Sequence, residues 1–199
     1  MNSIDIYIDF KSPAAYLALA PTRALLARTG ASANWRPFDT RLATVPRQKT
    51  AENKGEKHRR VRALARRDVH RLYADIQGLP MIFQDPPFDA KLAVAMLACL
   101  EHQPHKQIDT FIDTAFKWYW QDQQNLNEPD VLAALLQEVR IDIPLPEPSG
   151  VTRILTDATV AAHDRGVIET PAYLVAGQVF IGREHLPWIE ELLSANADN

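Results

Sequence analysis

A strand pattern that leads straight into a helix cap constrains the fold of this chain more than any other stretch. In segment 4–10, isoleucine and phenylalanine alternate with other residues, which is the period-two pattern of a β-strand. Ser12 is of a type preferred at a helix N-cap, and Pro13 suits the first helical position because its missing N–H is not needed there. Segment 14–28 then has a helical pattern. The Ser12 hydroxyl is therefore expected at the positive end of a helix, on the edge where open α/β folds bind ligands.

A proline before a late strand is the next informative feature. Thr170 and Pro171 stand directly before the strand pattern 172–176, and a second strand pattern at 178–181 follows Gly177. Proline removes a backbone donor and restrains the residue before it, so it normally marks an edge or a special turn. X–Pro is also the peptide bond for which the cis form costs least, about 0.5–1 kcal/mol. We therefore predict a cis Thr170–Pro171 bond that turns the backbone toward a ligand.

Helical patterns fill the middle of the chain. After a second strand at 32–38, a polar and basic stretch at 41–55 is interpreted as a mobile loop. Helices are then predicted at residues 56–77, 89–102, 106–121, 129–140, 151–166 and 184–195. This chain has the element order of a thioredoxin-like α/β fold. That order is strand, capped helix and strand, followed late by proline, strand, glycine, strand and helix. The sequence thus predicts a thioredoxin-like core with an inserted all-helical subdomain.

Segment Asp9–Leu17 carries a more specific signal, because it resembles the DF-x-SP-x-x-YL opening of 2-hydroxychromene-2-carboxylate isomerases and kappa-class glutathione transferases. Further segments resemble this family in the same order: Trp35–Phe38, Asp68 with Arg71, Gly78–Pro80, Gly166–Val175 and Phe180–Gly182. The resemblance covers essentially the whole chain. It implies a single DsbA-like domain over residues 1–199, with a thioredoxin-like core at 1–40 and 151–199 and a helical insertion at about 55–145.

The resemblance implies a glutathione-dependent isomerase that acts on a small aromatic substrate of the hydroxychromene-carboxylate type. Thiolate addition, bond rotation and elimination would isomerise the substrate and return the glutathione. Ser12 is the expected catalytic residue, as a hydrogen-bond donor to the glutathione sulfur. A helix dipole worth about 1 kcal/mol and a charge-assisted hydrogen bond worth about 1.5–3 kcal/mol together lower a thiol pKa of about 8.5 by about two units. Most of the bound thiol is then anionic without a protein base.

Besides Ser12, the resemblance assigns contacts with glutathione to Asn53, Arg62, Thr170, Pro171, Arg183 and Glu184. In the family, the residue before the proline pairs its backbone with the cysteinyl part, which is the role implied for Thr170. Segment Gly182–Leu186 is similar to a family turn, G-x-D-R-L, whose acid holds the γ-glutamyl ammonium. Glu184 keeps that charge on a longer side chain. Asn53 and Arg62 stand at roughly the spacing of a glutathione-binding Asn and Lys of the kappa class.

Composition excludes several other classes of protein. The 199 residues are 46% hydrophobic and 24% charged, as in ordinary globular domains, and the net charge of −3 gives no overall attraction to nucleic acid. The single cysteine, Cys99, excludes an intrachain disulfide, and we expect its side chain to be buried in an apolar helical run. The histidines show no metal-ligand spacing. Neither a signal-peptide pattern nor an apolar run of about 20 residues is found, so we expect a cytoplasmic protein without a membrane partner.

Basic residues concentrate in segment 54–71, which contains eight lysines and arginines. This run is either the solvated face of a helix or a clamp for a carboxylate of glutathione or substrate; a nucleic-acid patch is disfavoured because few aromatic residues interleave it. The same helix has one apolar face, formed by Val61, Leu64, Ala65, Leu72, Tyr73 and Ile76. Residues 118–120 are aromatic and serve either the core or the wall of an aromatic pocket.

Two other functions fit the same residues. One is a kappa-type glutathione transferase or peroxidase, and the other is a non-catalytic binding protein of thioredoxin fold. A disulfide oxidoreductase is excluded, because Ser12 and Ala15 occupy the positions where such enzymes carry their two cysteines. A homodimer is also compatible with the resemblance.

Overall fold

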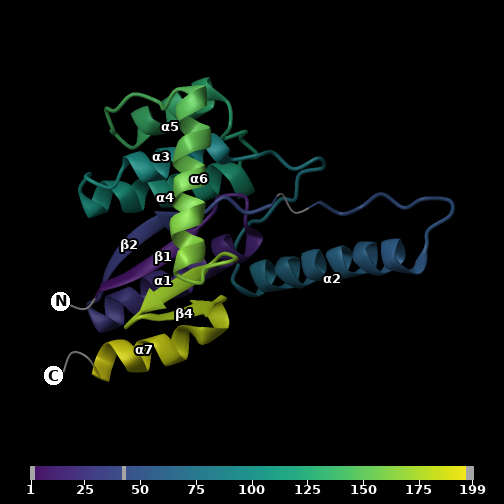
Figure 1. Cartoon of the computed structure of the whole chain (residues 1–199), viewed down its shortest axis with the longest axis horizontal. Coiled ribbons are helices and arrows are strands. Elements are labelled where there is room, and N and C mark those ends of the chain that lie inside the picture. Colours follow the sequence, from purple (N-terminus) through teal and green to yellow (C-terminus); the bar gives the residue numbers. More distant parts are fainter. Residues whose placement is uncertain (1–2, 42–43, 196–199) are drawn as a thin grey trace.

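The computed structural model describes residues 3–41 and 44–195, and a four-stranded mixed sheet lies at its centre (Figure 1). The strands lie in the order β2-β1-β3-β4, where β1 is Ser3–Ile8, β2 is Ser32–Pro37, β3 is Ala172–Val175 and β4 is Gln178–Ile181. β1 runs parallel to β2 and antiparallel to β3, and β4 pairs antiparallel with β3. A strand from the start of the chain and one from its end are therefore neighbours.

The first helix, α1, spans Pro13–Thr29, with Ser12 as its N-cap and Gly30 at its end in the left-handed conformation (φ 66°). The remaining helices of the described residues are α2 Lys54–Ile76, α3 Lys91–Cys99, α4 His105–Trp120, α5 Pro129–Glu138, α6 Pro148–Asp164, the short 3₁₀ helix η1 Arg183–His185, and α7 Leu186–Ala195. Helices α2 to α5 all come between β2 and α6. The predicted α/β class with an insertion of helices is confirmed.

Alternating side chains of β1 bury both faces of the sheet, as expected for a strand covered on two sides. Ile4, Ile6 and Ile8 point into the larger hydrophobic core, to which α1, α3, α4 and α5 contribute. Tyr7 points the other way, into a smaller core with Ala162 of α6. Figure 1 shows α6 crossing the sheet on that other side.

Several element boundaries differ from those predicted. β1 ends at Ile8 and not at residue 10, because the next residue, Asp9, leaves the strand pairing and binds Thr40 and Lys11. The predicted loop 41–55 ends earlier, because Asn53 caps α2; residues 42 and 43 of that loop lie outside the described residues. The predicted helix 89–102 is shorter, and the last helix is preceded by η1.

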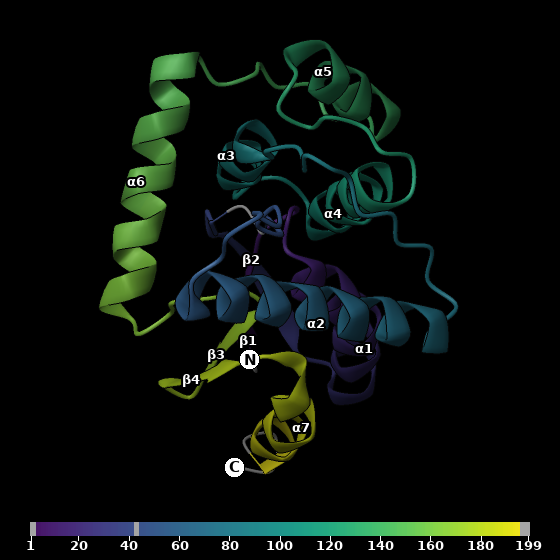
Figure 2. The same ribbon diagram turned by 90° about the vertical axis from the view of Figure 1, so that its right-hand side faces the viewer.

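Most of the apolar face predicted for α2 is exposed rather than packed against the rest of the protein. Val61, Leu72 and Ile76 are 49%, 56% and 72% exposed, and Ala74 is the only residue of α2 that is fully buried. The helix instead turns its less exposed positions, among them Arg67 and His70, toward the body of the protein. Figures 1 and 2 show α2 running beside α1 at one end and projecting from the body at the other.

The expectation of a buried Cys99 was wrong. Cys99 is the last residue of α3, and its side chain is exposed. The apolar run around it is buried through Leu97 and Leu100, and the helical spacing places position 99 on the opposite side.

Candidate active site at the start of the first helix

Ser12 and Thr170 meet at the N-terminus of α1, although they are distant in the sequence. The Ser12 backbone is extended (φ −83°, ψ 113°), which lets its Oγ turn back and accept a hydrogen bond from the Ala15 N–H at 3.2 Å. The same hydroxyl donates to the carbonyl oxygen of Thr170 at 3.3 Å. Ser12 is 7% exposed, so its hydroxyl lies at the edge of the protein interior. An N-cap and a loop from the other end of the chain thus form one site.

The loop that carries Thr170 continues the site toward η1. The Thr170–Pro171 peptide bond is cis, as is Asp85–Pro86, which no sequence pattern had singled out. The Pro171 carbonyl accepts a hydrogen bond from the N–H of Gly182 at 2.9 Å. Gly182 has a φ of 101° and a ψ of 151°, which only glycine adopts without strain. This hydrogen bond places the start of η1 directly beside the loop of Thr170 and Pro171, called the proline loop below.

Arg183 and Glu184 follow Gly182 and border the same loop. The Arg183 guanidinium lies 4.2 Å above the centre of the Tyr73 ring of α2, and its Nη1 donates to the Leu17 carbonyl of α1 at 3.5 Å. Glu184 is exposed, and its carboxylate folds back over Gly182. The two oppositely charged residues therefore lie where α1, α2 and the proline loop approach one another.

Asn53 and Arg62 are not brought to this place. Asn53 is the N-cap of α2, where its side chain accepts from the Glu56 N–H at 2.9 Å while the Glu56 carboxylate accepts from the Asn53 N–H. That end of α2 points away from the body (Figure 1). The Arg62 side chain is exposed. Within a single copy of the chain, Asn53 serves as a helix cap and Arg62 lies in solvent.

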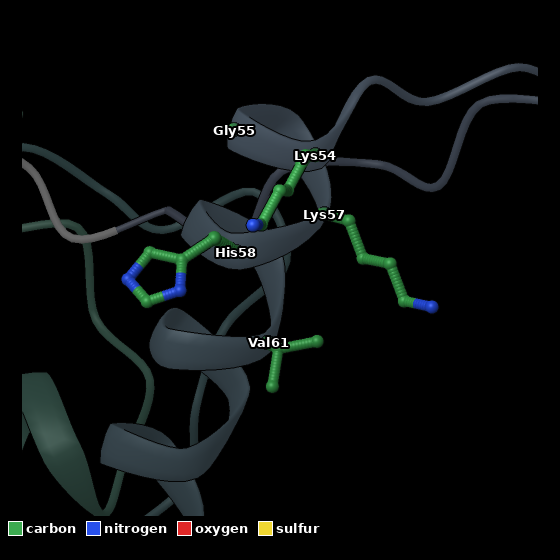
Figure 3. Close-up of a pocket in the computed structure, with 5 residues that line it drawn as sticks. All are labelled: Lys54, Gly55, Lys57, His58 and Val61. Atoms are coloured by element: carbon green, nitrogen blue, oxygen red, sulfur yellow. The ribbon is translucent and has the colours of Figure 1, made fainter.

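A shallow cavity of about 560 Å³ also lies at this end of α2, between Lys54, Lys57, His58 and Val61 (Figure 3). Its lining residues come from the first two turns of α2. Because these turns project from the body, the cavity is separate from the site around Ser12.

A buried charge cluster behind Ser12 was missed by the sequence analysis. The Lys11 ammonium contacts the carboxylates of Asp9, Asp39 and Asp89 at 2.7, 2.6 and 3.5 Å. Burial alone would lower the pKa of Lys11, but the charges of Asp9 and Asp39 outweigh it and raise this pKa above its usual value. Burial raises the pKa of Asp9. The cluster joins the turn before Ser12 to the segments that follow β2 and precede α3. The polar residues flanking Phe10 were its only signal in the sequence.

Aromatic side chains pack together in the core beside the first turn of α1. Tyr16 stacks on Trp120 of α4, with ring centres 5.9 Å apart and planes inclined by 8°, and Phe83 meets the edge of Trp120 at 5.4 Å. The Tyr16 hydroxyl donates to the Pro80 carbonyl at 3.0 Å and accepts from Gln121 at 2.8 Å. Tyr16 and Trp120 are 3% and 4% exposed, so both rings belong to the core.

Among residues 3–41 and 44–195, no cluster of three or more His, Cys, Asp or Glu side chains is arranged to hold a metal ion. No helix in that part of the chain has the length and apolar character needed to span a bilayer.

Comparison with known proteins matches this chain to one protein family. The model of the DSBA-like thioredoxin domain matches residues 3–194. A 2-hydroxychromene-2-carboxylate isomerase from Sphingobium xenophagum is 27% identical over 202 residues, which cover 96% of this chain and 98% of that protein. A solved 2-hydroxychromene-2-carboxylate isomerase aligns with a TM-score of 0.70 at 18% identity over 98% of both chains. The cytosolic disulfide reductase DsbM from Pseudomonas aeruginosa, solved with GSH, aligns with a TM-score of 0.60 at 14% identity over 98% of both chains.

Proposed function

This chain belongs to the DSBA-like thioredoxin domain family, and from that premise we propose that it is a glutathione-dependent isomerase of small aromatic substrates of the hydroxychromene-carboxylate type. The contact between the Ser12 hydroxyl and the Thr170 carbonyl at the α1 N-terminus carries the proposal. It supports a site that stabilises an anion without any cysteine of the protein. The 27% identity with a 2-hydroxychromene-2-carboxylate isomerase supports the class of reaction.

Ser12 is the proposed catalytic residue because its hydroxyl can donate to a sulfur anion. Bound glutathione would supply a thiolate that adds to a conjugated aromatic carbonyl compound and later leaves it. The Ser12 hydroxyl donates at 3.3 Å to a neutral carbonyl, and an anionic sulfur is a stronger acceptor that can replace that carbonyl. The dipole of α1 favours the anion at the same point.

The residues around Ser12 fit three chemical parts of glutathione. The thiol suits Ser12, and the cysteinyl backbone suits the loop of Thr170 and Pro171, where the preceding residue, Glu169, is exposed. The γ-glutamyl end carries an ammonium and a carboxylate on one carbon, which suits the adjacent charges of Glu184 and Arg183. We propose no glutathione contact for Asn53 or Arg62 within one copy of the chain, since Asn53 caps the projecting end of α2 and the Arg62 side chain is exposed to solvent.

The aromatic residues beside Ser12 support the site from the interior. Tyr16 lies one turn after Ser12 on α1 and stacks on Trp120, and Phe83 meets the edge of Trp120. Tyr16 and Trp120 are 3% and 4% exposed, so they hold the first turn of α1 in place and offer no surface on which a substrate could stack. The aromatic class of the proposed substrate is therefore supported by the 27% identity with the isomerase.

A calorimetric titration with glutathione, followed by a spectrophotometric isomerisation assay, tests the proposal. We expect the wild type to bind glutathione and to isomerise a hydroxychromene-carboxylate only when glutathione is present. Ser12→Ala should keep the fold, because loss of a cap costs about 1 kcal/mol, while the ultraviolet thiolate titration of the bound thiol moves to higher pH. Ser194→Ala, which removes an exposed hydroxyl of α7, is the matched control and should change neither reading.

The possible results separate the competing functions. Conjugation of glutathione to an aromatic electrophile without isomerisation would favour a kappa-type transferase. Binding without any turnover would favour a non-catalytic binding protein. An unchanged thiolate titration in Ser12→Ala would remove Ser12 from the mechanism.

We also propose that the protein works as a homodimer in a reducing compartment such as the cytoplasm. The outward apolar stripe of α2, defined by Val61, Val69, Leu72 and Ile76, supports a second copy as its cover, because each of these side chains is at least 45% exposed. A reaction that depends on the free thiol of glutathione supports a compartment that keeps thiols reduced.

A further inference from the structure

The side of α2 that faces the body of the protein, which includes Arg67 and His70, holds basic side chains that lack acidic partners. The Nε of Arg67 is buried and has no hydrogen-bond partner. Among the ion pairs of the described residues, none includes Arg66, Arg67 or Arg183, whereas Arg60 on the same helix pairs with Glu52 at 2.8 Å. Buried polar groups are nearly always hydrogen-bonded, so an unpaired guanidinium nitrogen in this position calls for a water molecule or an anion.

His70 links these arginines to η1. It lies three residues after Arg67, so the two side chains are neighbours on the helix surface. Burial, together with the charges of Arg66 and Arg183, lowers the pKa of His70. Because Arg183 also lies 4.2 Å above the Tyr73 ring, one turn further along α2, the basic groups follow one another from Arg67 to η1.

This basic flank borders the site around Ser12. Arg183 directly follows Gly182, whose N–H donates to the Pro171 carbonyl at 2.9 Å, and the preceding carbonyl, of Thr170, accepts from Ser12. Arg183 also contacts Leu17 of α1. A ligand whose thiol lies at Ser12 therefore needs only the length of a short peptide to reach Arg183. An extended tripeptide spans roughly 10 Å.

We propose that Arg67, His70 and Arg183 bind the γ-glutamyl carboxylate of glutathione. The inference rests on the proposed function and selects one member of the basic run 54–71, Arg67, together with its neighbour His70. The γ-glutamyl end is chosen because its ammonium matches Glu184, which stands next to Arg183. A planar guanidinium can bind a carboxylate with two parallel hydrogen bonds, and the free Nε of Arg67 provides one of the donors.

The test compares Arg67→Gln with Arg59→Gln by calorimetry, using glutathione, γ-glutamylcysteine and cysteinylglycine as probes. Arg59 is an exposed arginine in the projecting N-terminal half of the same helix, so the control removes an equal charge away from the site. We expect Arg67→Gln to weaken glutathione and γ-glutamylcysteine by about tenfold to a hundredfold, the usual loss for a charge-assisted contact. Cysteinylglycine lacks the γ-glutamyl group, and its affinity should stay within about twofold. Arg67→Lys should recover part of the loss, because lysine keeps the charge without the fork.

Each other result is decisive. Equal effects of Arg67→Gln and Arg59→Gln on glutathione would overturn the carboxylate site and leave the Ser12 site intact. Equal weakening of cysteinylglycine would place the contact elsewhere on the ligand and also overturn it. If the wild type binds none of the three thiols, the proposed function itself fails together with this inference.

Discussion

At the scale of single residues, the neighbours Ser12 and Lys11 have different roles in the candidate site. Ser12 presents a hydroxyl to the ligand side, and Lys11, 2% exposed at its side chain, faces the interior among three carboxylates. The two residues are adjacent, so whatever fixes the Lys11 side chain also fixes the turn that carries Ser12. Asp9 strengthens this link, because its carboxylate also accepts from the N–H and hydroxyl of Thr40 at 2.7 Å each.

Replacing Lys11 by Met should destabilise the protein by about 3–5 kcal/mol, because removing one partner leaves buried carboxylates uncompensated. Lys91→Met is the matched control: Lys91 is half exposed and also contacts Asp89, so its loss should cost no more than about 0.5 kcal/mol. Urea unfolding at pH 7 measures both values. Equal stability of the two variants would show that the cluster is not a stabilising element.

The raised pKa of Lys11 also predicts a pH dependence. A group whose pKa is higher in the folded state contributes its stability in full below the unfolded value, here 10.5, and loses it as the pH rises through the folded value. The free energy of unfolding of the wild type should therefore fall above pH 10.5 by more than that of Lys11→Met. Parallel pH profiles of the two proteins would contradict the shift.

At the scale of elements, the link from β4 to α7 has to place Arg183 and Glu184 beside the proline loop. Gly182 makes this possible, because its backbone conformation lets its N–H reach the Pro171 carbonyl while the chain turns into η1. A side chain at this position would also meet the Glu184 carboxylate. The turn is thus set by one residue whose conformation is open almost only to glycine.

Gly182→Ala should destabilise the protein by about 1–3 kcal/mol, the usual cost of a strained backbone conformation, and should weaken glutathione binding by displacing Glu184. Gly150→Ala is the control. Gly150 lies in the first turn of α6 with open space around it, so alanine there should be neutral or stabilise by up to about 1 kcal/mol. Thermal unfolding and calorimetry give the two readings. A Gly182→Ala protein with wild-type stability would argue against a constrained turn.

At the scale of the whole molecule, charge is distributed unevenly. Segment 54–76 holds eight lysines and arginines against three acidic residues, a net +5, which leaves −8 for the remainder of a chain with a net charge of −3. α2 is therefore electrostatically complementary to the body of a second copy. At 1.5 Å per residue α2 is about 35 Å long, and with a width of about 10 Å it has a footprint of roughly 350 Å². Two helices docked reciprocally on two bodies, with both surfaces of each contact counted, would bury about 1,400 Å² in total. Docking of one helix on an unrelated partner would bury about half of that, below the size of a stable interface.

We expect the wild type to sediment as a dimer, at twice the 22.4 kDa of the chain, with or without glutathione. Leu72→Glu combined with Ile76→Glu should produce a monomer, because two charges replace exposed apolar side chains of the α2 stripe. Val160→Glu, at a side chain of α6 that is 54% exposed, should leave the dimer intact. A monomeric wild type, or one that instead binds nucleic acid or anionic vesicles through α2, would overturn the homodimer.

The sequence by itself determined the local geometry of the site. Period-two alternation, the preference of serine for an N-cap and the suitability of proline for the first helical turn act over a few neighbouring residues, so they place Ser12 at a helix start whatever packs around it. Tertiary structure decided which distant residues join that start. Pairing of β1 with β3 brings Thr170 to Ser12. Asn53 instead caps the projecting end of α2, Arg62 lies in solvent, and the Nε of Arg67 is buried. Tertiary packing likewise decided that Cys99 and the α2 stripe are exposed. Spacing shows that residues share a face, and only the packing of the whole chain determines what that face meets.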